Sequence, residues 1–226
     1  MPVPRLKLAI FDLDHTLLSG DSDVLWCEFL MDRGVLDRAQ FAERNAQVEQ
    51  AYGAGGITAQ AFTEFYLSTL AGRSRAALAA LRDAFMAACI LPRIPAAARD
   101  LVERHREAGD LLVLSTATNR FLVELTAPAL GFEHLLATEP DEAGGVFTGR
   151  TVGVLNMREG KPERLRQWLA ARGLPAAMLA EAAAYSDSIN DLPLLQAVGR
   201  PVAVDPDARL LAQARAAGWP VLRLAR

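Results

Sequence analysis

Two aspartates stand one residue apart at the end of an apolar run near the start of the chain. Residues 6–11 read LKLAIF, interrupted only by Lys7, and Asp12 and Asp14 follow. Residues two apart at a strand end point to the same side, so the two carboxylates share a site. Such crowding is tolerated if a divalent cation binds there or if one carboxyl stays protonated. The pair suits Mg²⁺ binding, nucleophilic attack by an ionised carboxylate and acid–base catalysis by its neighbour. An isolated Asp-x-Asp is also typical of a turn or a helix cap.

A second polar signal follows the next apolar run of this kind. In LLVLSTATN, residues 111–119, Ser115 and Thr116 stand where we expect a helix to begin. Backbone N–H groups at a helix N-terminus favour phosphate binding. The alternative is that one of the two hydroxyls only caps that helix.

Two further signals lie in the C-terminal half. In GKPERL, Lys161 stands beside a predicted helix N-terminus, and the only other lysine among 24 basic residues is Lys7. A lysine there suits phosphate binding as a compact point charge, although it could also be an ordinary surface residue. In SDSINDLPLL, Asp187 ends a predicted strand and Asp191 follows four residues later. These two could equally be a helix cap and an exposed carboxylate.

The remaining sequence indicates which elements hold these residues. Apolar strands alternate with amphipathic helices from residue 95 onward, which predicts a doubly wound α/β core with a parallel sheet covered on both faces. Residues 17–92 instead indicate an all-α bundle of about four helices inserted after the first strand, so the predicted core comprises residues 1–16 and 93–226. Ligands bind beyond the carboxyl ends of the strands in such a sheet, where all the signals above collect. We expect strands at 6–11, 111–115, 134–139, 182–187, 201–205 and 220–224, a polar hairpin region at 141–153, helices at 23–34, 38–53, 59–72, 75–91, 96–109, 119–131, 162–173, 189–199 and 206–218, and helix caps at Ser22, Thr58 and Ser74.

The order of the motifs FDLDHTLL, LVLSTATN, GKPERL and SDSINDLPLL resembles the four motifs of the haloacid dehalogenase superfamily. The helical insert is similar to the cap of its phosphoserine phosphatase-like branch, and the resemblance covers almost the whole chain. It implies a Rossmann-like core and a Mg²⁺-dependent phosphatase that acts on a small phosphorylated metabolite through an aspartyl-phosphate.

The resemblance also implies a role for each matched residue. Asp12 is the expected nucleophile, and Asp14 is the expected general acid and base. The expected Mg²⁺ ligands are Asp12, the Asp14 backbone carbonyl and Asp187. Thr116, or alternatively Ser115, is expected to bind the phosphate, with Ala117 beside it. Lys161 is expected to neutralise the phosphoryl oxygens, and Asn190 to lie near the phosphate. Asp191 is expected to orient Lys161 or metal-bound water. Ser188 and the STATN segment depart from the glycines usual in this branch.

The insert carries the sequence signal for the substrate. Phosphoserine recognition in the family uses a cap arginine, but residues 45–72 contain no Lys or Arg. Asp21 lies seven residues after Asp14, where the family places an acidic residue that meets the substrate's amino group, and Asp23 and Glu28 follow. Asp21 could instead only cap the first helix of the insert. We therefore expect an amine-bearing phosphomonoester, with histidinol phosphate first and other amino-alcohol phosphates next. Phosphoserine phosphatase, a phosphotransferase or mutase, and a non-catalytic binding module are the alternatives.

Composition excludes several other classes of function. The chain of 226 residues is 51% hydrophobic and 23% charged with a net charge of −3, an ordinary globular balance without a nucleic-acid-binding stripe. No apolar run approaches the length of a membrane span, and Cys27 and Cys89 indicate buried thiols rather than a disulfide framework. We expect a cytoplasmic protein that binds neither nucleic acid nor membrane. The sequence leaves the oligomeric state open.

Overall fold

The computed structural model describes residues 6–225, so residues 1–5 and 226 of the predicted core lie outside the described part. The strands are β1 Leu8–Phe11, β2 Leu111–Asn119, β3 His134–Ala143, β4 Val146–Val152, β5 Ala183–Ser186, β6 Arg200–Val204 and β7 Val221–Leu222. The α-helices are α1 Ser22–Asp32, α2 Arg38–Gly53, α3 Ala59–Leu67, α4 Arg75–Phe85, α5 Ala96–Glu107, α6 Arg120–Val123, α7 Thr126–Ala129, α8 Gly160–Ala171, α9 Leu192–Gln196 and α10 Ala208–Ala217. A π-helical turn, Met86–Ile90, and 3-10 turns at Leu91–Arg93, Ala176–Ala180 and Ile189–Asp191 complete the elements.

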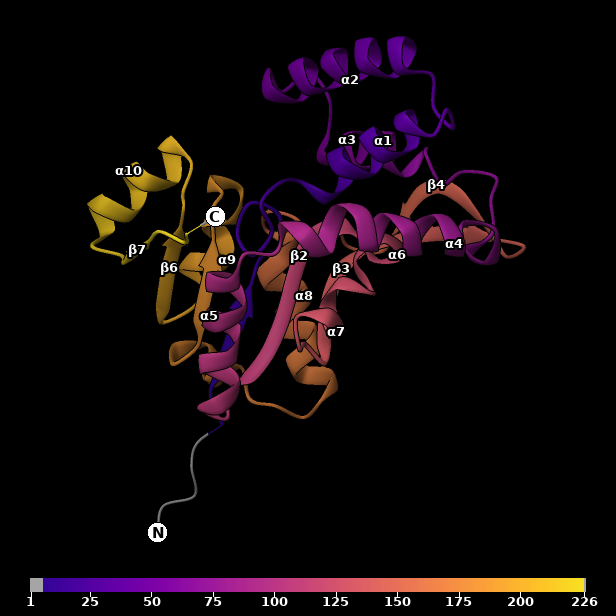
Figure 1. The fold of residues 1–226 in the computed structure, drawn as a ribbon. Helices are drawn as coiled ribbons and strands as arrows, with labels where there is room; N and C mark the ends of the chain where they lie inside the picture. Colours follow the sequence, from indigo (N-terminus) through magenta and orange to yellow (C-terminus); the bar gives the residue numbers. More distant parts are fainter. Residues whose placement is uncertain (1–5, 226) are drawn as a thin grey trace.

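One sheet of seven strands, in the order β4-β3-β2-β1-β5-β6-β7, forms the centre of the molecule (Figure 1). All its pairings are parallel except β3 with β4, which confirms the predicted α/β class. In the central strand β1, Phe11 is in register with Leu114 of β2 and Tyr185 of β5. The residues that follow these three positions therefore meet at the carboxyl edge of the sheet.

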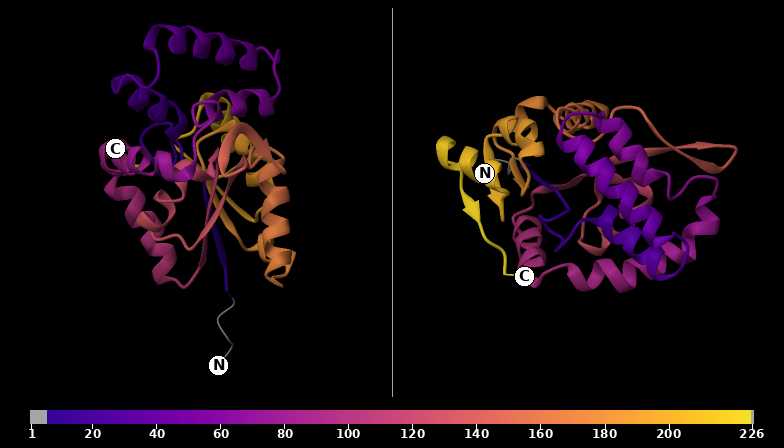
Figure 2. Two further views of the ribbon diagram at one scale, coloured as in Figure 1. Left: turned by 90° about the vertical axis from the view of Figure 1, so that its right-hand side faces the viewer. Right: turned by 90° about the horizontal axis from the view of Figure 1, so that it is seen from above.

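The alternation of side chains along β1 explains why helices cover both faces of the sheet (Figure 2). Ala9 and Phe11 belong to the apolar cluster that includes α5 and the insert. Leu8 and Ile10 belong to a second cluster, formed with α8, α9 and α10. A strand buried on both faces has no polar alternation, which is why β1 is apolar throughout.

The insert leaves and rejoins the core at one place, where the Ser19 N–H donates to the Arg93 carbonyl at 2.8 Å. Helices α1, α2 and α3 stand beyond the carboxyl ends of the strands, with α2 outermost (Figure 1). Trp26 of α1 and Phe85 of α4 share one apolar cluster with Phe121 of the core. The domain boundaries at 16/17 and 92/93 stay a prediction.

Several predicted elements are confirmed, and others have different bounds. Helix 38–53 has the predicted bounds, and Thr58 and Ser74 cap α3 and α4. The prediction that Ser22 caps the first helix of the insert is wrong, because Asp21 does so by accepting the Val24 N–H at 3.0 Å. The predicted hairpin forms between β3 and β4, with positive φ angles at its two turn glycines, Gly144 and Gly145.

The largest correction concerns residues 111–131. The strand predicted to end at Ser115 continues to Asn119, and the helix predicted over 119–131 is two four-residue helices, α6 and α7. Pairing with β3 extends the strand, with a shift of register between Ser115 and Asn119. This long-range pairing provides hydrogen-bond partners for backbone N–H and C=O groups in a segment where the local sequence predicts the approach to a helix.

No helix within residues 6–225 combines the length and apolar character that a membrane crossing requires. The cytoplasmic location stays a prediction.

Candidate active site

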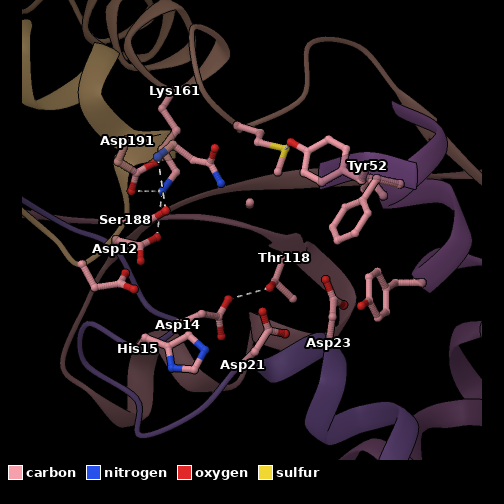
Figure 3. Close-up of a pocket in the computed structure, with 17 residues that line it drawn as sticks. Asp12, Asp14, His15, Asp21, Asp23, Tyr52, Thr118, Lys161, Ser188 and Asp191 are labelled. Atoms are coloured by element: carbon pink, nitrogen blue, oxygen red, sulfur yellow. Dashed lines mark hydrogen bonds and ion pairs between the residues drawn. The ribbon is translucent and has the colours of Figure 1, made fainter. Parts of the chain in front are cut away.

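A buried lysine connects two strand ends. Lys161 lies in the first turn of α8 and is 2% exposed. Its Nζ donates to Asp12 Oδ1 at 2.7 Å and to Asp191 Oδ2 at 2.6 Å (Figure 3). Both carboxylates raise the pKa of Lys161 and keep it charged, against the opposing effect of burial. The possibility of a solvated surface lysine is therefore excluded.

Asp14 lies in a different hydrogen-bonding environment from Asp12. Its carboxylate accepts the Ser22 N–H at 2.7 Å and the Thr118 hydroxyl at 2.8 Å. Burial first, and then the nearby charge of Asp21, raise the pKa of Asp14 to about 6. A carboxyl with this pKa can both give and take a proton near neutral pH.

The end of β5 also contributes Asp187, directly after the strand. The Thr16 hydroxyl lies 3.0 Å from Asp187 Oδ1 and 3.2 Å from Asp12 Oδ2, and it accepts the Asp187 N–H at 3.0 Å. Burial raises the pKa of Asp187 to about 7. Burial also raises the pKa of Asp12, with Lys161 opposing and the surrounding carboxylates reinforcing that rise. The site thus holds more negative charge than its one lysine balances.

These groups face a cavity of about 250 Å³ between the core and the insert. Among the described residues that line it, Lys161 is the single Lys or Arg. The full lining set comprises Asp12, Asp14, His15, Asp21, Asp23, Tyr52, Phe62, Thr63, Tyr66, Ala117, Thr118, Met157, Lys161, Asp187, Ser188, Asn190 and Asp191. Nearly every predicted site residue therefore reaches one cavity, including Asp21, which both caps α1 and lines the wall.

Ser115 and Thr116 lie behind the cavity wall, within β2, rather than at a helix start. Both are buried. The Ser115 hydroxyl accepts from Asn156 Nδ2 at 3.0 Å, whereas the Thr116 hydroxyl lies 3.4 Å from Asp14 Oδ2. The hydroxyl that reaches the cavity from this strand is that of Thr118. Of the two predicted phosphate-binding hydroxyls, Thr116 is the one on the side of Asp14.

Sequence reasoning missed Thr118, Asn156 and the aromatic side chains of the insert. Thr118 lies between the predicted strand at 111–115 and the predicted helix at 119–131, in a connection where the local pattern does not indicate the direction of a side chain. Phe62 and Tyr66 are four residues apart on α3, a spacing that also occurs on any buried helix face. Only their position over the strand ends distinguishes them from core residues.

Comparison with known proteins agrees with this geometry. A model of the haloacid dehalogenase-like hydrolase family matches residues 9–196. A histidinol-phosphatase of Neisseria meningitidis is 40% identical over 217 residues, covering 96% of this chain and 98% of that protein. A phosphoserine phosphatase of Mycobacterium tuberculosis is 35% identical over 237 residues, covering all of this chain and 74% of that protein.

Solved structures resemble the fold over nearly its whole length. A protein of unknown function from Bordetella pertussis superimposes with a TM-score of 0.92 at 45% identity, covering 96% of this chain and 98% of that one. A phosphoserine phosphatase with an analogue of its phospho-aspartyl intermediate superimposes with a TM-score of 0.69 at 17% identity, covering 98% and 94%, a likeness of fold. The chain therefore belongs to the haloacid dehalogenase-like hydrolase family, as the order of its four motifs predicted, and within that family to the phosphatases.

Proposed function

We propose that this chain is a Mg²⁺-dependent phosphomonoester hydrolase that works through a phosphorylated Asp12, with histidinol phosphate or a similar amino-alcohol phosphate as substrate. The observation that carries the proposal is the buried Lys161 ammonium, within 2.7 Å of Asp12 Oδ1 and 2.6 Å of Asp191 Oδ2, in a cavity that also holds Asp14. The proposal is supported by the grouping of one carboxylate, one fixed positive charge and a second carboxyl with a raised pKa around one small volume.

The residues divide the reaction into two steps. In the first, an Asp12 oxygen bonds to phosphorus, the ester P–O bond breaks, and Asp14 gives its proton to the departing alkoxide. In the second, Asp14 takes a proton from water, which attacks phosphorus, releases inorganic phosphate and regenerates the Asp12 carboxylate. The hydrogen bonds from Ser22 and Thr118 hold Asp14 in place for both steps. Lys161 offsets charge on the phosphoryl oxygens throughout.

The donor set fits magnesium. Within residues 6–225, no three His, Cys, Asp or Glu side chains form a metal site by themselves. Mg²⁺ commonly takes only one or two protein carboxylates and completes its shell with phosphate and water. Asp12 and Asp187, linked by the Thr16 hydroxyl, supply two hard oxygen donors, and the Asp14 backbone carbonyl is the proposed third. Bound there, the ion would supply positive charge for the phosphoryl group.

The charge of the cavity supports an amine-bearing substrate. Among the described residues that line it, six are aspartates and one, Lys161, is a Lys or Arg, which already pairs with two of the aspartates. The carboxylate of phosphoserine would therefore meet repulsion, whereas an ammonium group would be attracted to Asp21 and its neighbours. The relationship to a histidinol-phosphatase at 40% identity supports the same choice.

The test is release of phosphate from histidinol phosphate by the wild type, by Asp12→Asn and by Asp100→Asn, an exposed carboxylate on α5 that serves as control. Asp12→Asn should lower kcat by about a thousand-fold or more, and Asp100→Asn should not change it. Wild-type activity should vanish in a strong chelator and return with Mg²⁺. A folded Asp12→Asn variant with near wild-type turnover would refute the assignment of the nucleophile. Less than one phosphate released per alcohol formed, in the presence of an added acceptor alcohol, would identify a phosphotransferase instead.

A further inference from the structure

The end of the cavity away from Lys161 carries features that a simple amine does not use. Asp23, in the first turn of α1, lines the cavity together with Tyr52, Phe62 and Tyr66 of the insert. Resting on the proposed function, we propose that Asp23 and this aromatic wall bind a flat, basic ring of the substrate. The substrate is then an amino-alcohol phosphate that also bears a basic heteroaromatic ring, rather than any small amine-bearing ester.

Asp23 is positioned to accept a hydrogen bond from a ligand. The Asn119 amide donates to it at 3.3 Å, a long contact for a carboxylate. Burial, followed by the charges of Asp21 and Asp14, raises the pKa of Asp23 well above its ordinary value. Hydrogen bonds from the Asn119 and Thr118 side chains oppose this rise. A ring N–H or a ring cation would add a further donor and relieve the repulsion.

The aromatic wall is preassembled. The Tyr52 and Phe62 rings stack with centroids 4.3 Å apart, and Phe62 meets Tyr66 edge-on at 5.3 Å. The Tyr66 hydroxyl donates to Asn45 at 3.0 Å, so its polar end is already occupied. The Tyr52 hydroxyl reaches Met157 Sδ of the core at 3.8 Å, which joins the insert to the opposite wall. The Arg158 guanidinium already lies over Tyr52, 4.9 Å from the ring centroid, so Phe62 and Tyr66 are the rings that we expect to pack against a flat ring and attract positive charge.

The order of groups along the cavity matches the order of groups in such a substrate. Asp21 lies near Asp14 and raises its pKa, so it faces the part of the substrate next to the leaving oxygen, where the amine is. Figure 3 shows Asp21 between Asp14 and Asp23, with Tyr52 on the far side from Asp12. Phosphate, amine and ring therefore correspond to Lys161, Asp21 and Asp23 in turn. A cavity of about 250 Å³ is small for a ligand pocket and suits a metabolite with one ring.

Three phosphate esters distinguish how much the amine, the flat ring and the basicity of that ring each contribute to substrate recognition. They are 2-aminoethyl phosphate, phenylalaninol phosphate and histidinol phosphate. Hydrolysis of 4-nitrophenyl phosphate measures the chemical steps without recognition of an amine or a basic ring. Wild-type kcat/KM should rise in that order for the three amine esters. Asp23→Asn should lower kcat/KM for histidinol phosphate by roughly 10- to 150-fold and change that for phenylalaninol phosphate less than about 3-fold. Asp21→Asn should lower kcat/KM for all three amines by similar factors.

Matched controls test the wall and the charge separately. Phe62→Leu should lower kcat/KM for the two ring substrates and spare 2-aminoethyl phosphate, whereas Phe41→Leu should affect none, because Phe41 stacks on Phe65 outside the cavity. Glu28, which follows Asp21 and Asp23 in the sequence, is exposed on α1 and does not line the cavity, so Glu28→Gln should leave all rates unchanged.

The possible failures are distinguishable. Equal losses for histidinol and phenylalaninol phosphates in Asp23→Asn, with 4-nitrophenyl phosphate still hydrolysed, would overturn this inference and leave the proposed function standing. So would a wild type without preference for histidinol phosphate over phenylalaninol phosphate, a result that needs no variant to fold. A wild type that hydrolyses none of the four esters with Mg²⁺ would instead overturn the proposed function.

Discussion

Replacing Lys161 with methionine should destabilise the protein strongly, because it leaves two buried carboxylates facing each other. Lys161 is 2% exposed, and the side chains of its partners Asp12 and Asp191 are 9% and 5% exposed. Removing one partner of a buried ion pair costs about 3–5 kcal/mol. Methionine keeps the apolar stem, so the loss comes from the charge and not from packing.

The size of the destabilisation by Lys161→Met can also be calculated from the cost of protonating one of the two carboxyls. One carboxyl can escape the repulsion by binding a proton, and its ordinary pKa is 3.8. Protonation at pH 7 then costs about 4 kcal/mol, but only about 2 kcal/mol at pH 5.5. The destabilisation by Lys161→Met should therefore shrink by about half between these two pH values. The wild-type ammonium has a raised pKa and stays charged across this range, so its own titration does not contribute.

The assay is urea unfolding followed by tryptophan fluorescence, at pH 7 and pH 5.5 and with chelator present so that no cation replaces the lysine. Lys7→Met is the matched control, because Lys7 is the only other lysine and is exposed. It should change the free energy of unfolding by less than about 0.5 kcal/mol. Adding Asp191→Asn to Lys161→Met should recover part of the loss, since the two residues are coupled. A Lys161→Met variant within about 1 kcal/mol of wild type at pH 7, or a loss independent of pH, would refute this reasoning.

Three other predictions concern Asp14 and Asp187. Asp14→Asn should lower kcat more for an alkyl phosphate than for 4-nitrophenyl phosphate, whose leaving group needs no proton, and equal losses in steady-state assays would contradict the acid role. Asp187→Ala should raise the Mg²⁺ concentration that gives half-maximal activity, because an oxygen ligand is lost, and an unchanged magnesium titration would remove Asp187 from the metal site. Without metal, the free energy of unfolding should fall as pH rises from about 4 to 7. The folded protein holds protons on Asp14 (pKa about 6) and Asp187 (pKa about 7) that the unfolded chain, with an ordinary value of 3.8, releases. The free energy of unfolding should decrease by at most about 1.4 kcal/mol per pH unit for each carboxyl. Urea midpoints that rise between pH 4 and 7 would contradict this prediction.

Much of the fold was predictable because its signals are local. The apolar stretch of β1 and the capping residues Thr58 and Ser74 each act within a few residues of where they stand. The placement of Asp12, Lys161 and Asp187 in one cavity follows from a topological rule about parallel sheets. Their types and order along the chain were therefore sufficient to predict the core of the site.

Only the tertiary structure decided the rest, because it depends on partners distant in sequence. Strand β2 continues past Ser115 since β3 offers it backbone partners, and this turns the Thr118 hydroxyl toward Asp14. Asp23 and the rings of Tyr52 and Phe62 resemble ordinary helix residues until the insert folds over the strand ends. The sequence by itself thus determined the reacting groups at the carboxyl edge of the sheet. Long-range packing decided the shape and charge of the cavity wall opposite them, because a helix face shows its spacing in the sequence but not its partner.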